Sequence, residues 1–388
     1  MSYKSFEFAF PTRIVFGPGE SMKAAEYAAG LTDGKIMILT YADILLPCVK
    51  QLTADLDRLG RPYVLYNKCL ANPGAEAVDA AAKVCSEEGC SLVLGVGGGS
   101  VIDTAKATAL LVKNPAEGGI WTYVGEGAEP QNGALPIMLV VTIASTGSEG
   151  NESFVITDKE GKQKLIYNHP AVRSALSVCD PELSLTLPPK QTALGAIDVF
   201  SHVLEQYLHG DSHVEVSDHM SYAVMEAIVK WAPVAVKEPQ NLDARSNLLW
   251  ASILAMSRVL GVGHEENWLT HMLEHAVSAK YNIPHAAGMS GLMPAYLDFV
   301  KAKGFSADKL AKIAALFGGE DAAESLSAFE QSLGLPADLK AVCGFVPEEE
   351  ILRDMAVNAL PWGSMEAAGY GEFSQEDALT VIRNAFTR

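Results

Sequence analysis

Short apolar runs alternate with amphipathic stretches along the chain up to about residue 182. Apolar positions recur at helical spacing within residues 75–88 and 100–112, which predicts two helices there. Four runs rich in β-branched or other apolar residues flank or precede these stretches and predict strands at residues 35–40, 62–67, 91–96 and 137–142. This alternation is typical of βαβ units around a mostly parallel sheet.

The pattern changes after Asp180-Pro181 and the paired prolines Pro188-Pro189, which can end a strand and then start a helix. No convincing strand pair follows, and helical periodicity covers residues 190–208, 216–236, 244–260, 266–280, 307–317 and 349–360. We therefore predict an α/β domain over residues 1–182 and an all-α domain over residues 183–388.

Composition narrows the class of protein. The 388 residues are 49% apolar, which permits sizeable cores, and their net charge of −18 argues against a nucleic-acid partner. The longest apolar run is about half of the roughly 20 residues that a membrane helix needs, and the N-terminus has no signal-peptide pattern. Six cysteines without CxxC pairs suit reduced thiols. We expect a soluble, cytoplasmic protein without a membrane partner.

A glycine-rich turn, Gly95-Val-Gly-Gly-Gly-Ser100, lies between a predicted strand and a predicted helix. Glycines let backbone N–H groups approach a pyrophosphate, and the helix N-terminus adds partial positive charge. A plain tight turn is the alternative, and we assign that role to Gly17-Pro-Gly19. A second strand-to-loop junction, residues 142–149, carries hydroxyls and a glycine and could converge on the same ligand.

All nine histidines lie between His169 and His285. Asp198 and His202 are four residues apart on a predicted helix, and His271 and His275 repeat that spacing on another. With His285, or with His275 in its place, these side chains could surround one divalent ion. Carboxylate and imidazole ligands suit Fe²⁺ or Zn²⁺. The remaining histidines are interpreted as surface or structural residues: His169, His209, His213, His219 and His264.

Two other functions fit parts of the sequence. The segment His271-Met-Leu-Glu274-His275 matches the HxxEH pattern of a zinc hydrolase, with Glu274 as general base. That hypothesis leaves the glycine-rich turn and the Asp198/His202 pair without a role. A cofactor-binding protein without catalytic activity is a further alternative, against which the full set of metal-ligand candidates argues.

Through these motifs the chain resembles the iron-containing alcohol dehydrogenases. The resemblance runs in order from residues 11–17 through residues 97–103 and 146–149 to His271-x3-His275-x9-His285. Asn151, the stretch at residues 205–207 and Trp268-x-x-His271 favour the butanol dehydrogenase and broad aldehyde reductase branch. The family's fold is an α/β dinucleotide-binding domain followed by a helical metal-binding domain, and relatives suggest a homodimer. A polyol dehydrogenase (glycerol or propanediol type) of the same fold is the alternative within the family.

The resemblance implies a role for each candidate residue. His275 becomes a proton relay, and Asn151 and Trp268 become substrate contacts. The metal ligands fall on Asp198, His202, His271 and His285. The cofactor contacts fall on Gly97, Gly98, Gly99, Ser100, Asp103, Thr142, Thr146 and Lys164.

One departure concerns the choice between NAD and NADP. NADP-using relatives carry a small glycine-rich stretch with a serine after the strand that ends here at Thr40, whereas this chain reads Tyr41-Ala-Asp43-Ile-Leu45. An acid there can bind a ribose hydroxyl and would repel a 2′-phosphate, so Asp43 favours NAD, unless it caps the following helix. We expect a metal ion to polarise the oxygen of an aldehyde and the nicotinamide to transfer hydride to the aldehyde carbon.

Overall fold

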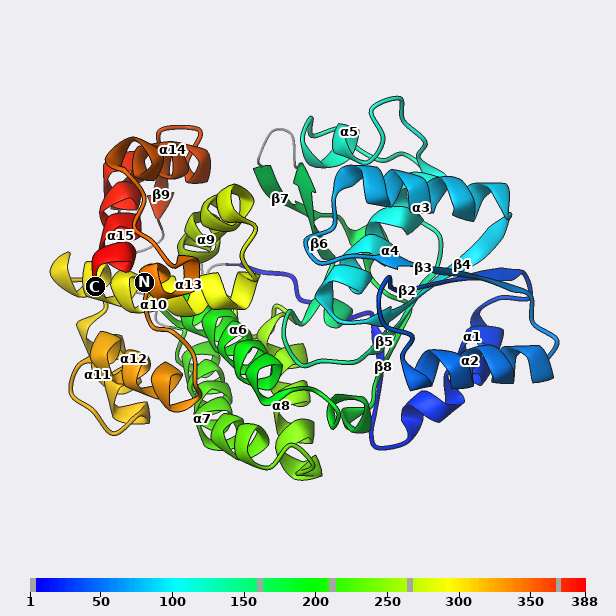
Figure 1. Ribbon diagram of the computed structural model, residues 1–388, viewed down its shortest axis with the longest axis horizontal. Coiled ribbons are helices and arrows are strands. Elements are labelled where there is room, and N and C mark those ends of the chain that lie inside the picture. Colours follow the sequence, from blue (N-terminus) through cyan, green and yellow to red (C-terminus); the bar gives the residue numbers. More distant parts are fainter. Residues whose placement is uncertain (1–4, 159–162, 209–213, 264–267, 368–370) are drawn as a thin grey trace. The chain divides into compact units, whose positions relative to one another are not determined.

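The structure is a computed structural model that describes residues 5–158, 163–208, 214–263, 268–367 and 371–388. The chain forms two compact units. One consists of residues 9–186, and the other consists of residues 187–388 together with the described residues 5–8. Each unit is described separately below (Figure 1).

The first unit is built on a six-stranded sheet in which every neighbouring pair is parallel. The central strands are buried along most of their length, as expected for a parallel sheet with both faces covered. In spatial order the strands are β3 (Tyr63–Cys69), β2 (Lys35–Tyr41), β4 (Cys90–Gly97), β5 (Ile137–Val141), β8 (Leu176–Cys179) and β1 (Arg13–Phe16).

Helices cover both faces of this sheet (Figure 1). On one face α1 (Ala24–Leu31) and α2 (Pro47–Arg58) pack against alternate strand residues such as Ile36 and Ile38. On the other lie α3 (Ala75–Glu87) and α4 (Gly99–Lys113), with the short α5 (Trp121–Val124) nearby. The crossovers that follow β2 and β3 run in opposite directions across the sheet, so the carboxyl ends of β2 and β4 flank a topological switch point.

The second unit is helical. Its long helix α6 (Pro189–Leu208) packs against α7 (Glu215–Lys237), α8 (Leu242–Ala255) and α10 (His285–Ala302). Helix α9 (Leu269–Tyr281) packs against α10 and α14. The other helices are α11 (Ala307–Leu316), α12 (Ala322–Ser332), α13 (Leu339–Cys343), α14 (Glu349–Ala359) and α15 (Gln375–Thr387). None of the helices in the described part of the chain is both long and apolar enough to cross a membrane.

The predicted fold class is confirmed, with differences in detail. All four predicted strands and both predicted helices of the first half are present as β2–β5, α3 and α4. The short strands β1 and β8 were not predicted, nor was the antiparallel pair of β6 (Ser153–Asp158) and β7 (Gln163–Asn168). The second half is not wholly helical, because β9 (Ser364–Ala367) and β10 (Gly371–Ser374) form a small antiparallel pair.

Candidate metal centre and nucleotide-binding turn

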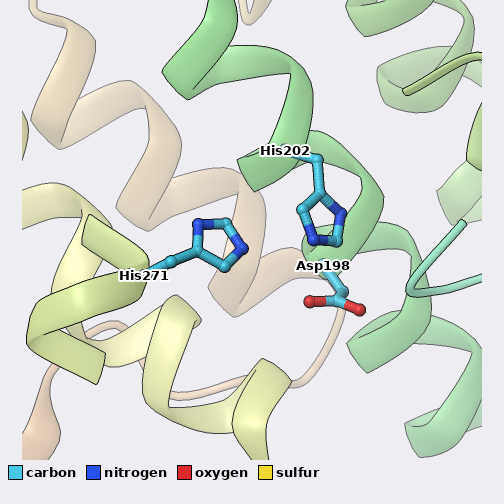
Figure 2. A group of neighbouring side chains, drawn as sticks. All are labelled: Asp198, His202 and His271. Atoms are coloured by element: carbon cyan, nitrogen blue, oxygen red, sulfur yellow. The ribbon is translucent and has the colours of Figure 1, made fainter. Parts of the chain in front are cut away.

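Helix α6 carries the first two candidate ligands. From Ala196 to Leu208 every residue of this helix is buried, because other helices of the unit surround it. Asp198 and His202 are one turn apart, which places the carboxylate and the imidazole on one face. Figure 2 shows the His202 ring directed toward the carboxylate of Asp198, with the ring of His271 of α9 beside them.

Three helices bring the four predicted ligands together. One ligand atom from each of Asp198, His202 and His271 lies within 4.8 Å of the other two. Nε2 of His285, the first residue of α10, lies 3.5 Å from Oδ1 of Asp198. The imidazole rings of His202 and His271 are stacked with their centroids 4.7 Å apart, and the rings of His271 and His285 are 5.3 Å apart.

The donor set fits a divalent cation. Nδ1 of His202 and Nε2 of His271 are buried and have no hydrogen-bond partner within the described ranges. Burial lowers the pKa of His202 to about 4, so its imidazole is neutral at neutral pH. Neutral imidazole nitrogens beside a carboxylate are ligands that Fe²⁺ and Zn²⁺ accept. A cation bound beside Asp198 would give Nε2 of His271, which is otherwise unsatisfied, a partner.

Two glutamates contact the histidines on the side away from this cluster. Oε2 of Glu205 on α6 is paired with Nδ1 of His271, and Oε2 of Glu274 on α9 is paired with Nδ1 of His285. Burial disfavours charge on Glu205 and His271, but their mutual attraction prevails, so the pKa of Glu205 is lowered and that of His271 is raised. We did not predict these two contacts from the sequence. The signal for Glu205 was its position three residues after His202 on a buried helix.

The structure separates His271 from His275, the pair on which the zinc-hydrolase hypothesis depends. His271 groups with Asp198 and His202, whereas His275 groups with Glu274 and His285. Glu274 is fully buried and paired with His285, so it does not lie beside an ion held by His271 and His275 as a general base would.

His275 and Trp268 lie close to the cluster. The ring of His275 is 5.3 Å from that of His285 and 6.5 Å from that of His271, centroid to centroid. Trp268 precedes α9 with a φ of 50°, an unusual value for a residue with a side chain. Its ring meets those of His271 and His202 edge-on, at centroid distances of 5.3 Å and 6.1 Å. Both residues therefore adjoin the candidate ligands.

In the first unit, the glycine-rich turn joins the carboxyl end of β4 to the N-terminus of α4. A Cβ at Gly97 would lie 2.6 Å from a methyl of Val101, one at Gly98 would lie 2.5 Å from a methyl of Ile143, and one at Gly99 would lie 2.5 Å from the methyl of Thr146. Close packing with α4 at Gly97, and with the loop after β5 at Gly98 and Gly99, therefore requires glycine here. Ser100 follows in the first turn of α4, where N–H groups lack partners within the helix.

The loop after β5 is fastened to the turn and to α4. The N–H of Thr142 donates to the carbonyl of Gly97 over 3.1 Å, and Oγ1 of Thr146 accepts from the N–H of Ser148 over 3.3 Å. Lys106 on α4 is fully buried and places its ammonium nitrogen 2.5–3.0 Å from five oxygen atoms of Ser148, Asn151 and Ser153. The role of Lys106 was not predicted from the sequence, although a lysine within an otherwise apolar stretch of a helix indicates a buried, paired charge.

The remaining predicted cofactor residues are spread over this unit. Asp103 is buried on α4, accepts from the Ser148 hydroxyl over 3.2 Å, and is influenced electrostatically by half-buried Lys164 of β7. Burial raises the pKa of Asp103 to about 6 and lowers that of Lys106 to about 8. Asp43 is exposed after β2 and does not cap α2, whose N-cap residue is Leu46.

Asn151, predicted to contact substrate, is buried in the loop. Its side-chain oxygen accepts from Lys106 over 2.9 Å and from the N–H of Ser153 over 2.8 Å. This oxygen therefore stabilises the conformation of the loop.

The histidines interpreted as surface or structural residues include two that the structure describes. His169 accepts a hydrogen bond from the N–H of Ala171 over 3.1 Å and so caps a short turn. His219 is exposed on α7. His209, His213 and His264 lie outside the described residues.

Two family profiles together match nearly the whole chain. The profile described as iron-containing alcohol dehydrogenase matches residues 11–181. The profile described as the C-terminal part of the Fe-containing alcohol dehydrogenase family matches residues 192–386.

Individual relatives match three quarters of the chain or more. The probable NADH-dependent butanol dehydrogenase 2 of Bacillus subtilis (strain 168) is 31% identical over 400 residues, covering 98% of this chain and 99% of the relative. The NADPH-dependent aldehyde reductase YqhD of Escherichia coli (strain K12) is 32% identical over 292 residues, or 75% of each chain. The crystal structure of NADH-dependent butanol dehydrogenase A from Thermotoga maritima superposes with a TM-score of 0.90 at 30% identity, covering 99% of this chain and 100% of that one.

Proposed function

The chain belongs to the iron-containing alcohol dehydrogenase family, and we propose that it is a metal-dependent enzyme that transfers hydride between NAD(H) and short-chain primary alcohols or aldehydes. The family assignment confirms the resemblance found in the sequence, and with it the expectation of an NAD(P)-dependent alcohol dehydrogenase. The observation that carries the proposal is the convergence of Asp198, His202 and His271, with His285 against Asp198.

We assign the metal to these four side chains, with Fe²⁺ as the first candidate and Zn²⁺ as the second. The buried Nε2 of His271 supports the assignment because it has no hydrogen-bond partner in the described structure. When bound, the cation would supply a Lewis acid for the oxygen of the substrate, and the nicotinamide would supply or accept the hydride. The work of the protein is to hold four donors in place and keep their surroundings dry.

We assign the nucleotide to the turn after β4. Gly97, Gly98 and Gly99 let the backbone approach a pyrophosphate, and half-buried Gly99 and Ser100 begin α4 with N–H groups available to an anion. Thr142 and Thr146 border the same turn, and Asp103 and Lys164 lie beyond it. The position at the switch point of the sheet supports this assignment.

We further propose that NAD(H) is preferred to NADP(H). Asp43 is exposed just beyond the carboxyl end of β2, where its carboxylate can accept hydrogen bonds from a ribose and would repel a 2′-phosphate. Asp43→Asn should lower the ratio of kcat/KM for NADH to that for NADPH. Glu76→Gln, at an exposed acid of α3, is the matched control and should leave this ratio unchanged.

His275 is assigned to proton transfer, and Trp268 to an apolar wall for the substrate. The His275 ring adjoins that of His285, and imidazole exchanges protons near neutral pH. The Trp268 ring covers the edges of His202 and His271. Asn151 remains a predicted substrate contact, although its side-chain oxygen is engaged by Lys106.

The test is steady-state oxidation of NADH by butanal, with chelator-stripped protein before and after addition of Fe²⁺ or Zn²⁺. We expect activity only after metal is restored, and its loss in His271→Ala with an unchanged circular dichroism spectrum. His219→Ala, at an exposed histidine of α7, should retain activity. Activity of His271→Ala equal to wild type would refute the assignment. Reduction of NAD⁺ by glycerol or 1,3-propanediol, compared with its reduction by butanol, tests the polyol alternative. Ester or peptide cleavage without nicotinamide would favour a hydrolase.

A cytoplasmic location and a homodimer complete the proposal. All six cysteines are free thiols, which supports a reducing compartment. Light scattering after size exclusion tests the dimer, for which a mass near twice 41.4 kDa is expected.

A further inference from the structure

Two buried carboxylates hold the outer nitrogens of two candidate ligands. Glu205 and Glu274 are 3% and 0% exposed, and each directs its Oε2 at the Nδ1 of a histidine. Glu205 serves His271, and Glu274 serves His285. Because a carboxylate only accepts, each Nδ1 carries the hydrogen, and when the ring is neutral, as a metal ligand must be, its lone pair resides on Nε2.

The Nε2 atoms of these two rings face the cluster of candidate metal ligands. Nε2 of His285 lies 3.5 Å from Oδ1 of Asp198. Nε2 of His271 is buried and has no hydrogen-bond partner in the described part of the chain. The two glutamates thus select the tautomer that leaves a lone pair for an ion, and they fix the direction in which it points.

The same glutamates link the three helices that carry the ligands. Glu205 also accepts a hydrogen bond from the N–H of Thr270 in the first turn of α9, so it joins α6 to α9. Glu274 joins α9 to α10. The relative rotation of these helices, which decides where each imidazole points, is therefore set by groups outside the ligand cluster.

Gly288 provides space for one of these contacts. It is three residues after His285 on α10, and a Cβ there would lie 2.5 Å from Oε1 and 2.8 Å from Cγ of Glu274. Its φ is not positive, so the backbone does not require glycine. Glycine within a helix costs about 1 kcal/mol relative to alanine. The chain retains a less favourable residue where alanine would displace Glu274 from His285.

We propose that Glu205 and Glu274 are positioning residues that set the tautomer and direction of His271 and His285, and that Gly288 is the space that allows Glu274 to do so. The inference rests on the proposed metal site. The competing explanation is that the two carboxylates only stabilise the fold. That explanation predicts a change in the free energy of unfolding without a change in metal affinity.

The experiment measures Zn²⁺ affinity of the full-length, chelator-stripped protein in competition with a chromophoric chelator. We expect Glu205→Gln, Glu274→Gln and Gly288→Ala each to weaken the affinity 10- to 100-fold. Gly288→Ala leaves both carboxylates in place, so it tests the inference even if a glutamine variant fails to fold.

Two controls accompany these variants. Glu350→Gln removes an exposed charge on α14. Gly291→Ala disturbs α10 at a different contact, because a Cβ there would meet Leu339 and the backbone of Asp338 at 2.9–3.0 Å. Both should retain the wild-type affinity for Zn²⁺. A loss in Gly291→Ala as large as that in Gly288→Ala would assign the effect to general disturbance of the helix and overturn the inference.

A double-mutant cycle isolates the contact between Gly288 and Glu274. In the Glu274→Ala background the carboxylate that a new methyl would strike is gone, so Gly288→Ala should cause no further loss of affinity. Equal losses in both backgrounds, or wild-type affinity in Glu274→Gln and Gly288→Ala, would overturn the inference and leave the proposed function standing. If the wild-type protein bound no Zn²⁺ or Fe²⁺, the proposed metal site would itself fail, and the inference with it.

Discussion

The phenolic oxygen of Tyr41 accepts a hydrogen bond from the backbone N–H of Gly98 over 2.7 Å. Tyr41 is the last residue of β2, and Gly98 follows β4, so the contact joins two neighbouring strand ends at the switch point of the sheet. A Cβ at Gly97 would lie 3.2 Å from the tyrosine ring. The shape of the glycine-rich turn therefore depends on a side chain from the adjacent strand.

Removing this hydroxyl should affect both stability and nucleotide binding. Tyr41→Phe leaves the buried Gly98 N–H without its acceptor, which should cost about 1–3 kcal/mol in the free energy of unfolding. NADH affinity, measured by fluorescence titration, should fall several-fold as the turn loosens. Tyr63→Phe removes only a 3.4 Å contact to Asp57 at the surface and should change neither quantity. Wild-type stability and affinity in Tyr41→Phe would contradict the role assigned to Tyr41.

Gly99→Ala should uncouple nucleotide binding from metal binding. The new methyl would lie 2.5 Å from that of Thr146, so the loop after β5 must move away from the turn. We expect the Kd for NADH to rise at least tenfold, while Zn²⁺ affinity in the helical unit stays unchanged. Gly30→Ala, within α1 and with no heavy atom within 4 Å of the added carbon, should be neutral or slightly stabilising. Unaltered NADH binding in Gly99→Ala would place the nucleotide elsewhere.

The buried acid Glu149 predicts a specific dependence of stability on pH. Burial raises its pKa from 4.5 to about 7, so between these values the folded state holds a proton that the unfolded state has released. The free energy of unfolding should therefore fall as pH rises from about 4.5 to about 7, by up to roughly 3 kcal/mol. Glu149→Gln removes this titration.

Urea unfolding at pH 5 and pH 8 checks this prediction. Relative to wild type, Glu149→Gln should gain stability between the two pH values. Glu88→Gln, an exposed acid paired with Lys35, should show no comparable gain. A constant difference between Glu149→Gln and wild type from pH 5 to pH 8 would show that Glu149 stays ionised in the folded protein.

Lys106 should be among the more costly residues to replace in the first unit. Lys106→Met would remove the donor shared by oxygen atoms of Ser148, Asn151 and Ser153 and would leave Asp103 without its nearby positive charge. We expect a loss of about 3–5 kcal/mol in the free energy of unfolding. Lys83→Met, at an exposed lysine of α3, should lie within about 0.5 kcal/mol of wild type. A similar small change in Lys106→Met would show that the loop holds its shape without the ammonium.

The apolar pattern was sufficient for strands β2 to β5 and insufficient for the two four-residue strands of the sheet, β1 and β8. Strands β2, β4 and β5 are buried on both faces, so their sequences are continuous apolar runs. The outer strand β1 and the short β8 have four residues each, too few for a pattern. In the second half, Pro284 is the N-cap residue of α10, and the helix that begins at His285 was not predicted.

For the candidate metal site, residue spacing identified the ligand residues but not the residues that hold them in place. The i,i+4 rule placed Asp198 with His202, and it placed His271 with His275 equally well. Which of the latter two histidines faces α6 depends on the rotation of α9 about its axis, and the contact of Glu205 with His271 and Thr270 fixes that rotation. Such a contact joins residues about 65 positions apart in sequence, so local pattern cannot reveal it.

We propose that Asp198, His202, His271 and His285 together bind one catalytic cation. The decisive experiment is anomalous diffraction from crystals of the Zn²⁺-loaded protein, recorded on both sides of the zinc absorption edge. We expect one strong peak per chain, about 2.0–2.2 Å from an oxygen of Asp198 and from one nitrogen of each histidine. A peak bound by His271 and His275 without Asp198, or no peak among the four side chains, would contradict it.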